Sequence, residues 1–197
     1  MFTASGYSID LISLPGHESE NSYSGSDDIS LDFFNNHKEI INKNRILIGH
    51  STGAKFILDW VDRSIINTEI ELIIIDPAIY SGKFQYFKAI IRNIVDDLRF
   101  ILDYKKVPFA IPINIMKSSY KLVPVMTFLK EKNVLGAFSK LNNFNYKILW
   151  GTKDLTTPYK WSKEIKKIYP DLQIIDILNR SHGWIIEEPE LLLKYLE

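Results

Sequence analysis

Residues 46–58 read ILIGHSTGAKFIL, and this stretch decides the fold. The branched apolar run at its start predicts a short buried strand over residues 45–49. The segment that follows, 51–65, repeats apolar residues at helical spacing and predicts an amphipathic helix. Ser51 therefore lies at a sharp turn that leads directly from a strand into a helix.

The turn suits a nucleophile. A serine hydroxyl is a weak nucleophile unless a neighbouring base activates it, and a sharp strand-to-helix turn pushes the hydroxyl out of the sheet. The same turn points the next backbone N–H, that of Thr52, toward an oxyanion formed on attack. Side chains on either side of such a turn would clash, so we expect glycine there, and Gly49 and Gly53 occupy those places. The alternative is a strand-to-helix turn that contains an incidental serine.

Strands and helices are predicted to alternate on both sides of this turn. The expected strands are 7–14, 45–49, 70–75, 146–150 and 172–178, and the expected helices are 30–42, 51–65, 159–168 and 189–196. Ser30 is the expected cap of the first helix. Parallel strands need a crossover long enough for a helix, so this alternation predicts an α/β fold with a mostly parallel sheet and flanking helices.

Residues 81–143 interrupt the alternation. Apolar residues from Phe84 to Ile101 repeat at helical spacing, and the uncharged run VPFAIPINIM follows at 107–116. Pro112 and Pro124 exclude one long helix through this region. We expect a core formed by residues 1–80 and 144–197, with residues 81–143 inserted as a helical cap.

A base and an acid are expected downstream of Ser51. Asp154 and His182 each follow a predicted strand, and the carboxyl ends of parallel strands are where ligands of open α/β sheets bind. The chain order Ser51, Asp154, His182 is that of one group of serine triads. Asp76 also ends a predicted strand and is the alternative acid. His50 is expected to be a packed, hydrogen-bonded histidine, because neighbouring side chains diverge at such a turn.

With these residues in view, the chain from residue 5 onward resembles the α/β-hydrolase fold superfamily. Four segments carry the likeness, in the family's order: GYSIDLISLPGHES, ILIGHSTGA, ILWGTKDLTTP and SHGWIIEEPE. The resemblance implies that Ser51 is the nucleophile, His182 the base and Asp154 the acid, and it implies acyl transfer to water. Relatives with haloalkane dehalogenase or epoxide hydrolase chemistry carry aspartate at the position of Ser51.

The start of the chain departs from the family pattern. Members open with further strands, and a His-Gly loop after their third strand donates a second oxyanion N–H. Only MFTAS precedes the likeness here, and the third strand would lie between residues 9–14 and 46–48. We expect an N-terminally shortened chain with weak hydrolase activity. Alternatively, the two flanking strands pair directly and another group supplies the donor.

Composition limits the partners and the cofactors. The 197 residues suit one domain, with 46% apolar and 24% charged residues. Lys and Arg together number 24, as do Asp and Glu, so no nucleic-acid partner is expected. The absence of cysteine excludes disulfides and thiolate metal sites, and no metal-ligand spacing is visible, so no metal or cofactor is expected. Without a signal-like start or an apolar run of membrane-spanning length, we expect a cytoplasmic protein.

The expected substrate is a small hydrophobic carboxylic ester or thioester, with an amide less favoured. No arginine cluster suggests a phosphate or carboxylate clamp, and the apolar middle of the insertion suggests a pocket for an acyl chain. The same apolar residues can equally serve to pack the cap onto the core. A second hypothesis is a catalytically weak or inactive relative that acts as a binding or interaction module. The oligomeric state is left open.

Overall fold

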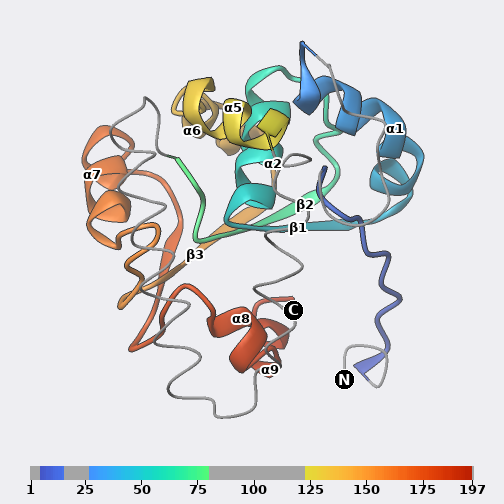
Figure 1. Ribbon diagram of the computed structural model, residues 1–197. Helices are drawn as coiled ribbons and strands as arrows, with labels where there is room; N and C mark the ends of the chain where they lie inside the picture. The colour runs from blue at the N-terminus through green and yellow to red at the C-terminus, as the bar shows by residue number, and fades with distance from the viewer. Residues whose placement is uncertain (1–4, 16–26, 80–122, 197) are drawn as a thin grey trace, which may run out of the picture.

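The computed structural model describes residues 5–15, 27–79 and 123–196, and its centre is a four-stranded sheet (Figure 1). The strands are β1 (Ile46–His50), β2 (Glu71–Ile75), β3 (Tyr146–Gly151) and β4 (Ile174–Ile177), in the spatial order β1-β2-β3-β4. Every neighbouring pair is parallel. The predicted α/β fold with a parallel sheet is confirmed.

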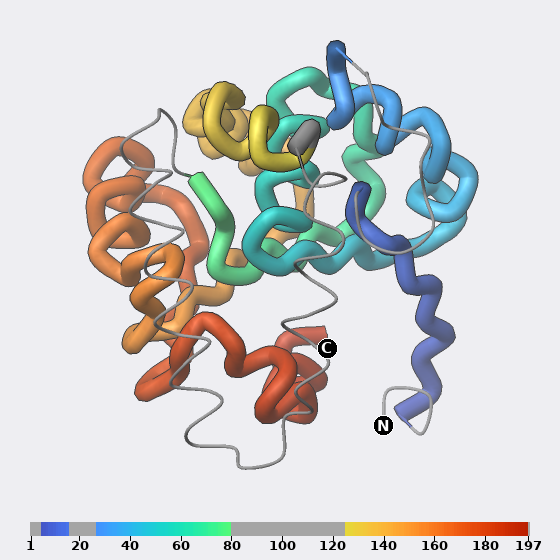
Figure 2. The backbone as a smooth tube through the Cα atoms, in the orientation of Figure 1, coloured from blue at the N-terminus to red at the C-terminus, as the bar shows by residue number. Residues whose placement is uncertain are grey.

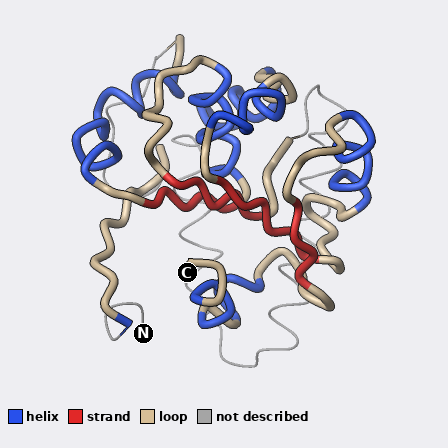
Figure 3. The backbone as a smooth tube through the Cα atoms, turned by 180° about the vertical axis from the view of Figure 1, so that it is seen from behind, coloured by secondary structure: helices blue, strands red, loops and turns tan. Residues whose placement is uncertain are grey.

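The central strands are continuous apolar runs because both of their faces are covered. Leu72, Ile73, Ile74 and Ile75 of β2 are all fully buried. One cluster of buried side chains lies on the face that α2 covers, and a second includes Trp184 and Leu192 on the opposite face. Figure 3 shows the sheet with helices on both sides.

Helices follow each strand, as the alternation predicted. They are α1 (Ile29–Lys43), α2 (Thr52–Asp62), α5 (Val123–Glu131), α6 (Ala137–Lys140), the 3-10 turn η3 (Leu141–Asn143), α7 (Lys160–Ile168), α8 (Trp184–Glu187) and α9 (Glu190–Leu193). In Figure 1, α1, α2, α5 and α6 lie above the sheet, and α8 and α9 lie below it. No helix in the described ranges is long and apolar enough to cross a membrane.

Three local predictions were wrong. Residues 7–14 form no strand, because no described backbone group hydrogen-bonds to them, and they descend at one side of the molecule (dark blue in Figure 2). The cap of α1 is Asp28, whose carboxylate accepts the Leu31 N–H at 3.2 Å, whereas the predicted cap Ser30 lies inside the helix. The closing helix predicted over 189–196 is only the short α9 (Glu190–Leu193), and a further short helix that was not predicted, α8 (Trp184–Glu187), precedes it.

Most of the predicted cap lies outside the described residues, so the division into core and cap stays a prediction. Its described end packs on the core. Val125 and Phe128 are buried, and the Phe128 ring stacks on Phe56 of α2 with 4.4 Å between centroids. For these two residues the contacts agree with the interpretation that the apolar insertion packs onto the core. Met126 is 39% exposed.

Candidate active site

Ser51 stands at the junction of β1 and α2 in a conformation that few residues adopt. Its φ is 53° and its ψ is −110°, outside the regions open to most non-glycine residues. Backbone hydrogen bonds hold it there: the Ser51 N–H donates to Ile75 O at 2.9 Å, and Ser51 O accepts from Lys55 at 3.2 Å and from Ala78 at 3.1 Å. Strain of this kind persists only where the surroundings fix it, and it is frequent at active sites.

The two glycines beside Ser51 differ. A Cβ on Gly49 would lie 2.8 Å from the backbone N of Ala54 and 2.6 Å from Ile57 Cδ1, so only glycine fits. A Cβ on Gly53 would meet no described atom within 4 Å. The predicted clash is therefore present at Gly49, and the prediction was wrong at Gly53. The reason is that Gly53 faces a cavity beside β1.

His182 connects Ser51 to Asp154. Its Nε2 lies 3.0 Å from Ser51 Oγ, and its Nδ1 lies 2.7 Å from Asp154 Oδ2. The histidine side chain is 11% exposed and the aspartate side chain is fully buried. The structure therefore brings Ser51 together with Asp154 and His182, which follow it by more than a hundred positions in the sequence. A histidine bonded in this way can accept the serine proton while the carboxylate orients its ring.

The loops that carry Asp154 and His182 are joined through their backbones. The Lys153 N–H donates to Arg180 O at 2.9 Å. A Cβ on Gly151 would lie 2.7 Å from the same oxygen, so the close approach of the loops requires glycine at this position. Thr157 then fixes the Asp154 carboxylate, donating its N–H at 2.8 Å and its hydroxyl at 2.7 Å.

Asp76, the alternative acid, is engaged elsewhere. Its carboxylate accepts the Gly151 N–H at 2.8 Å and the Trp184 Nε1–H at 2.9 Å. Burial, reinforced by the negative charge of Asp154, raises the pKa of Asp76 well above its ordinary value. The geometry therefore places Asp154, and not Asp76, against the His182 ring. Asp76 therefore joins the last residue of β3 to the first residue of α8, on either side of which lie the loops of Asp154 and His182.

His50 supports His182 from the side. The two rings lie 4.6 Å apart between centroids, and His50 Nε2 is 3.0 Å from the backbone oxygen of His182. A carbonyl only accepts, so this nitrogen carries the proton. Burial, together with the neighbouring His182, lowers the pKa of His50 to about 3, so its ring is neutral near pH 7. This matches the packed, hydrogen-bonded histidine predicted at this position.

Thr52 is the first residue of α2, and the first N–H groups of a helix have no partner within the helix. Its N–H therefore needs no partner within α2, which is compatible with the predicted role of oxyanion donor. The predicted second donor belongs to a loop that follows a strand absent from the described sheet.

One grouping was not expected from the sequence. His50, Asp76 and His182 offer possible metal-ligating atoms that all lie within 4.8 Å of one another. All three side chains already make hydrogen bonds within the protein. Spacings of 26 and 106 residues carry no metal-ligand pattern, so no signal in the sequence could have revealed it. The contacts of Thr157 and Trp184 with the two aspartates were also not predicted. The only sequence signal for these residues is that they lie in the two quoted segments ILWGTKDLTTP and SHGWIIEEPE.

Many solved structures resemble this fold. An E-2-(acetamidomethylene)succinate hydrolase aligns with a TM-score of 0.62 at 16% identity, over 91% of this chain and 75% of that one. A bromoperoxidase from Bacillus anthracis aligns with a TM-score of 0.63 at 15% identity, over 93% and 79%. An alpha/beta hydrolase enzyme from a lagoon-sediment metagenome aligns with a TM-score of 0.52 at 20% identity, over 85% and 67%.

Sequence comparisons gave no such likeness: no family model and no curated protein matches the chain. At these identities, the structural matches establish a shared fold and leave the reaction to be argued from the site itself.

Proposed function

Because the chain has the α/β-hydrolase fold, we propose that it is a serine hydrolase that cleaves a small hydrophobic carboxylic ester or thioester. The observation that carries the proposal is the continuous hydrogen-bonded path from Ser51 Oγ through His182 to Asp154, with distances of 3.0 and 2.7 Å. One fold can support many reactions, so the proposed reaction depends on these hydrogen bonds and not on the fold.

The proposed reaction has two stages. In the first, His182 Nε2 takes the Ser51 proton as Oγ attacks the acyl carbon, and the Thr52 N–H donates to the oxyanion. The protonated His182 then gives its proton to the leaving alcohol or thiol, which leaves an acyl-enzyme. In the second stage His182 activates water, which releases the acid and restores Ser51. Asp154 stabilises the charged imidazole in both stages.

The substrate class follows from the charge of the site. The ionisable groups that the structure connects to Ser51 are His182 and, through it, Asp154, and the side chains of His50 and Asp76 lie close to His182. An uncharged acyl group is therefore favoured. An ester and a thioester differ in the leaving group, an alcohol or a thiol, and His182 would protonate either one.

A second candidate is a weak or inactive relative that acts as a binding module. It is favoured by the outer edge of β1, with which no described strand pairs, since Thr52 is expected to give one oxyanion donor and a strand beside that edge is expected to give the other. Loss of one such donor lowers kcat by about 10²- to 10³-fold, so a chain without the second donor would be a slow hydrolase.

Hydrolysis of p-nitrophenyl butyrate and of butyryl-thiocholine tests the proposal. We expect measurable turnover that Ser51→Ala and His182→Ala both abolish. The matched control Ser139→Ala, an exposed serine on α6, should leave turnover unchanged. Equal turnover in wild type and Ser51→Ala would contradict the proposal, and a folded wild type without turnover would favour the binding module.

A further inference from the structure

The loop that carries His182 has to cross the sheet to reach Ser51. In the strand order β1-β2-β3-β4, Ser51 follows β1 and His182 follows β4, so the two residues start from opposite ends of that order. Three strand spacings amount to about 14 Å. The 3.0 Å between His182 Nε2 and Ser51 Oγ therefore depends on contacts that hold the loop over the ends of the strands.

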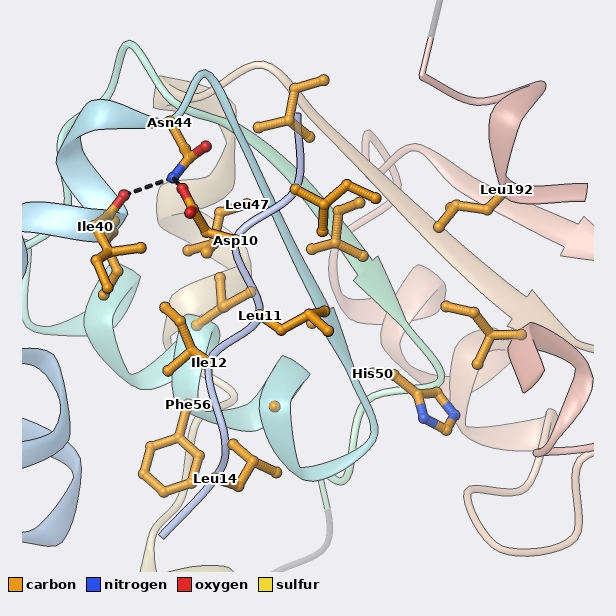
Figure 4. A pocket seen from close by; sticks show the side chains of 18 of the residues that line it. Asp10, Leu11, Ile12, Leu14, Ile40, Asn44, Leu47, His50, Phe56 and Leu192 are labelled. Atoms are coloured by element: carbon orange, nitrogen blue, oxygen red, sulfur yellow. Dashed lines mark hydrogen bonds between the residues drawn. The ribbon is translucent and has the colours of Figure 1, made fainter. Parts of the chain in front are cut away.

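One of these contacts comes from the strand of the nucleophile itself. His50 is the last residue of β1 and directly precedes Ser51, and its Nε2–H donates to the backbone oxygen of His182 at 3.0 Å. Figure 4 shows the His50 ring at this end of the strand, next to the C-terminal segment in pale red. The contacts of the loop described above reach residues that follow β2 and β3. His50 thus joins the loop of the base directly to the strand of the nucleophile.

The ring of His50 also limits the orientation of the His182 ring. The two ring centroids lie 4.6 Å apart, and the planes are inclined by 39°. The torsion that turns a histidine ring is broad, so its rotamer preference alone does not fix the direction of Nε2. A neighbouring ring at this distance restricts the rotation that would withdraw Nε2 from Ser51 and Nδ1 from Asp154.

His50 is suited to this role because its own position and charge are fixed. It pairs with Ile75 of β2 in the sheet, and the next N–H along the chain, that of Ser51, donates to Ile75 O at 2.9 Å. Burial, together with the neighbouring His182, lowers the pKa of His50 to about 3. A neutral ring keeps its donor near pH 7 and does not repel the positive charge that His182 gains when it takes the serine proton.

We propose that His50 is a positioning residue, which holds the backbone oxygen and the ring of His182 so that Nε2 points at Ser51 Oγ. Its part in catalysis rests on the proposed hydrolase function, whereas its hold on His182 is measurable without turnover. A misplacement of about 1 Å can lower a rate by about 10²-fold. Since His50 acts through His182 on the chemical step, its loss should lower kcat and leave KM within about twofold.

Replacements of His50 separate its hydrogen bond from its bulk. Glutamine carries an amide N–H at the reach of Nε2, asparagine carries one only at the reach of Nδ1, and phenylalanine keeps a ring without a donor. With p-nitrophenyl butyrate, His50→Asn and His50→Phe should lower kcat by roughly 10- to 100-fold. His50→Gln should stay within about fivefold of wild type, the factor that loss of the ring contact can account for.

The matched control is His37 on α1. It is also a half-buried histidine, and its Nδ1 lies 3.0 Å from a backbone oxygen, that of Phe33. His37→Phe should leave kcat and KM unchanged. Urea unfolding of every variant shows whether it is folded and by how much its free energy of unfolding has fallen.

Proton NMR tests the hold on His182 without a substrate. The Nδ1–H that His182 directs to Asp154 should give a far-downfield resonance, assigned among the four histidines by its loss in His182→Ala. We expect this resonance in wild type, His50→Gln and His37→Phe. It should broaden beyond detection in His50→Asn and His50→Phe. A residue that only stabilises the fold would lower the free energy of unfolding and leave the resonance in place.

The outcomes distinguish this inference from the proposed function. A folded wild type without turnover, whose resonance is lost in His50→Phe, would refute the hydrolase and support the positioning role. A resonance that persists in His50→Asn and His50→Phe, or is absent from folded wild type, would overturn the positioning role whether or not the chain hydrolyses esters. Equal kcat losses in His50→Gln and His50→Asn would overturn the role of the hydrogen bond.

Discussion

Ser51 and Asp76 are both held at positive φ, 53° and 43°, and they stand at the carboxyl ends of adjacent strands. Both conformations are unfavourable for residues other than glycine. The backbone at Ser51 and Asp76 is therefore held by surrounding residues and not by its own conformational preference. A side chain placed by such a corner has little freedom. The triad distances are set mainly by the strand ends and loops, and only then by side-chain rotamers.

Replacing Asp154 and Asp76 by asparagine, each in a separate variant, distinguishes their roles. Asp154→Asn should lower kcat by roughly 10⁴-fold, because the amide no longer holds the His182 tautomer that accepts the serine proton. Asp76→Asn should lower kcat far less and instead reduce the free energy of unfolding by about 1–3 kcal/mol, since the amide cannot accept both the Gly151 and the Trp184 N–H. Steady-state kinetics and urea unfolding measure both. A larger kcat loss in Asp76→Asn would reverse the assignment.

Alanine at the two flanking glycines should have opposite effects. Gly49→Ala forces backbone atoms apart and should reduce the free energy of unfolding by about 1–3 kcal/mol. Gly53→Ala lies within α2 with space around it, and should leave stability unchanged or raise it by about 0.5 kcal/mol. Equal destabilisation of the two variants in urea unfolding would show that the space at Gly53 is filled.

At the scale of the elements, α2 connects the nucleophile to the described end of the insertion. Lys55, four residues after Ser51, is fully buried, and its Nζ donates to Leu129 O of α5 at 2.7 Å. Burial lowers the pKa of Lys55 to about 7 from 10.5. Between these two pH values the unfolded chain holds a proton that the folded chain has released, so the free energy of unfolding rises with pH.

Replacing Lys55 should weaken the rise of the free energy of unfolding with pH. Lys55→Met removes the proton, so the stability of wild type relative to the variant should rise with pH between 7.5 and 9.5, by up to about 1.4 kcal/mol per pH unit. Urea unfolding at a series of pH values measures the difference. The control Lys160→Met, an exposed residue at the start of α7, should show no such slope. Parallel pH profiles for wild type and Lys55→Met would contradict the burial argument.

The elements also show what the sequence could predict. The strands β1, β2 and β3 were found within one residue at each end, because buried branched runs have few other structures open to them. Residues 7–14 carry the same kind of pattern, yet strand formation depends on a hydrogen-bonding neighbour, which a local pattern does not reveal. The cap of α1 was misplaced by two residues because Asp28 and Ser30 are equally good capping types.

The candidate site also contains residues that the sequence could identify and residues that it could not. Ser51, Asp154 and His182 were identified from short segments in a familiar order, and the structure places them together. The supporting contacts of Asp76, Thr157 and Trp184 were missed because they join loops more than 80 residues apart or depend on side-chain direction. A sequence pattern identifies reacting groups more readily than the groups that hold them.

At the scale of the whole molecule, a hydrogen-bonded Ser51–His182–Asp154 path stands beside a strand, β1, that has a neighbour on only one side among the described residues. The triad loops are joined by backbone and side-chain hydrogen bonds, whereas no described strand pairs with the outer edge of β1. His50 and Gly53, which flank Ser51 in the sequence, line a cavity beside β1.

The central claim is that His182 activates Ser51. Labelling with a fluorophosphonate, followed by intact mass and peptide mapping, tests it most directly because the reagent needs an activated serine and no knowledge of the substrate. We predict one label per chain, located at Ser51, that is absent from Ser51→Ala and His182→Ala and present in Ser139→Ala. A folded wild-type chain that takes no label, or takes it equally in His182→Ala, would contradict the account.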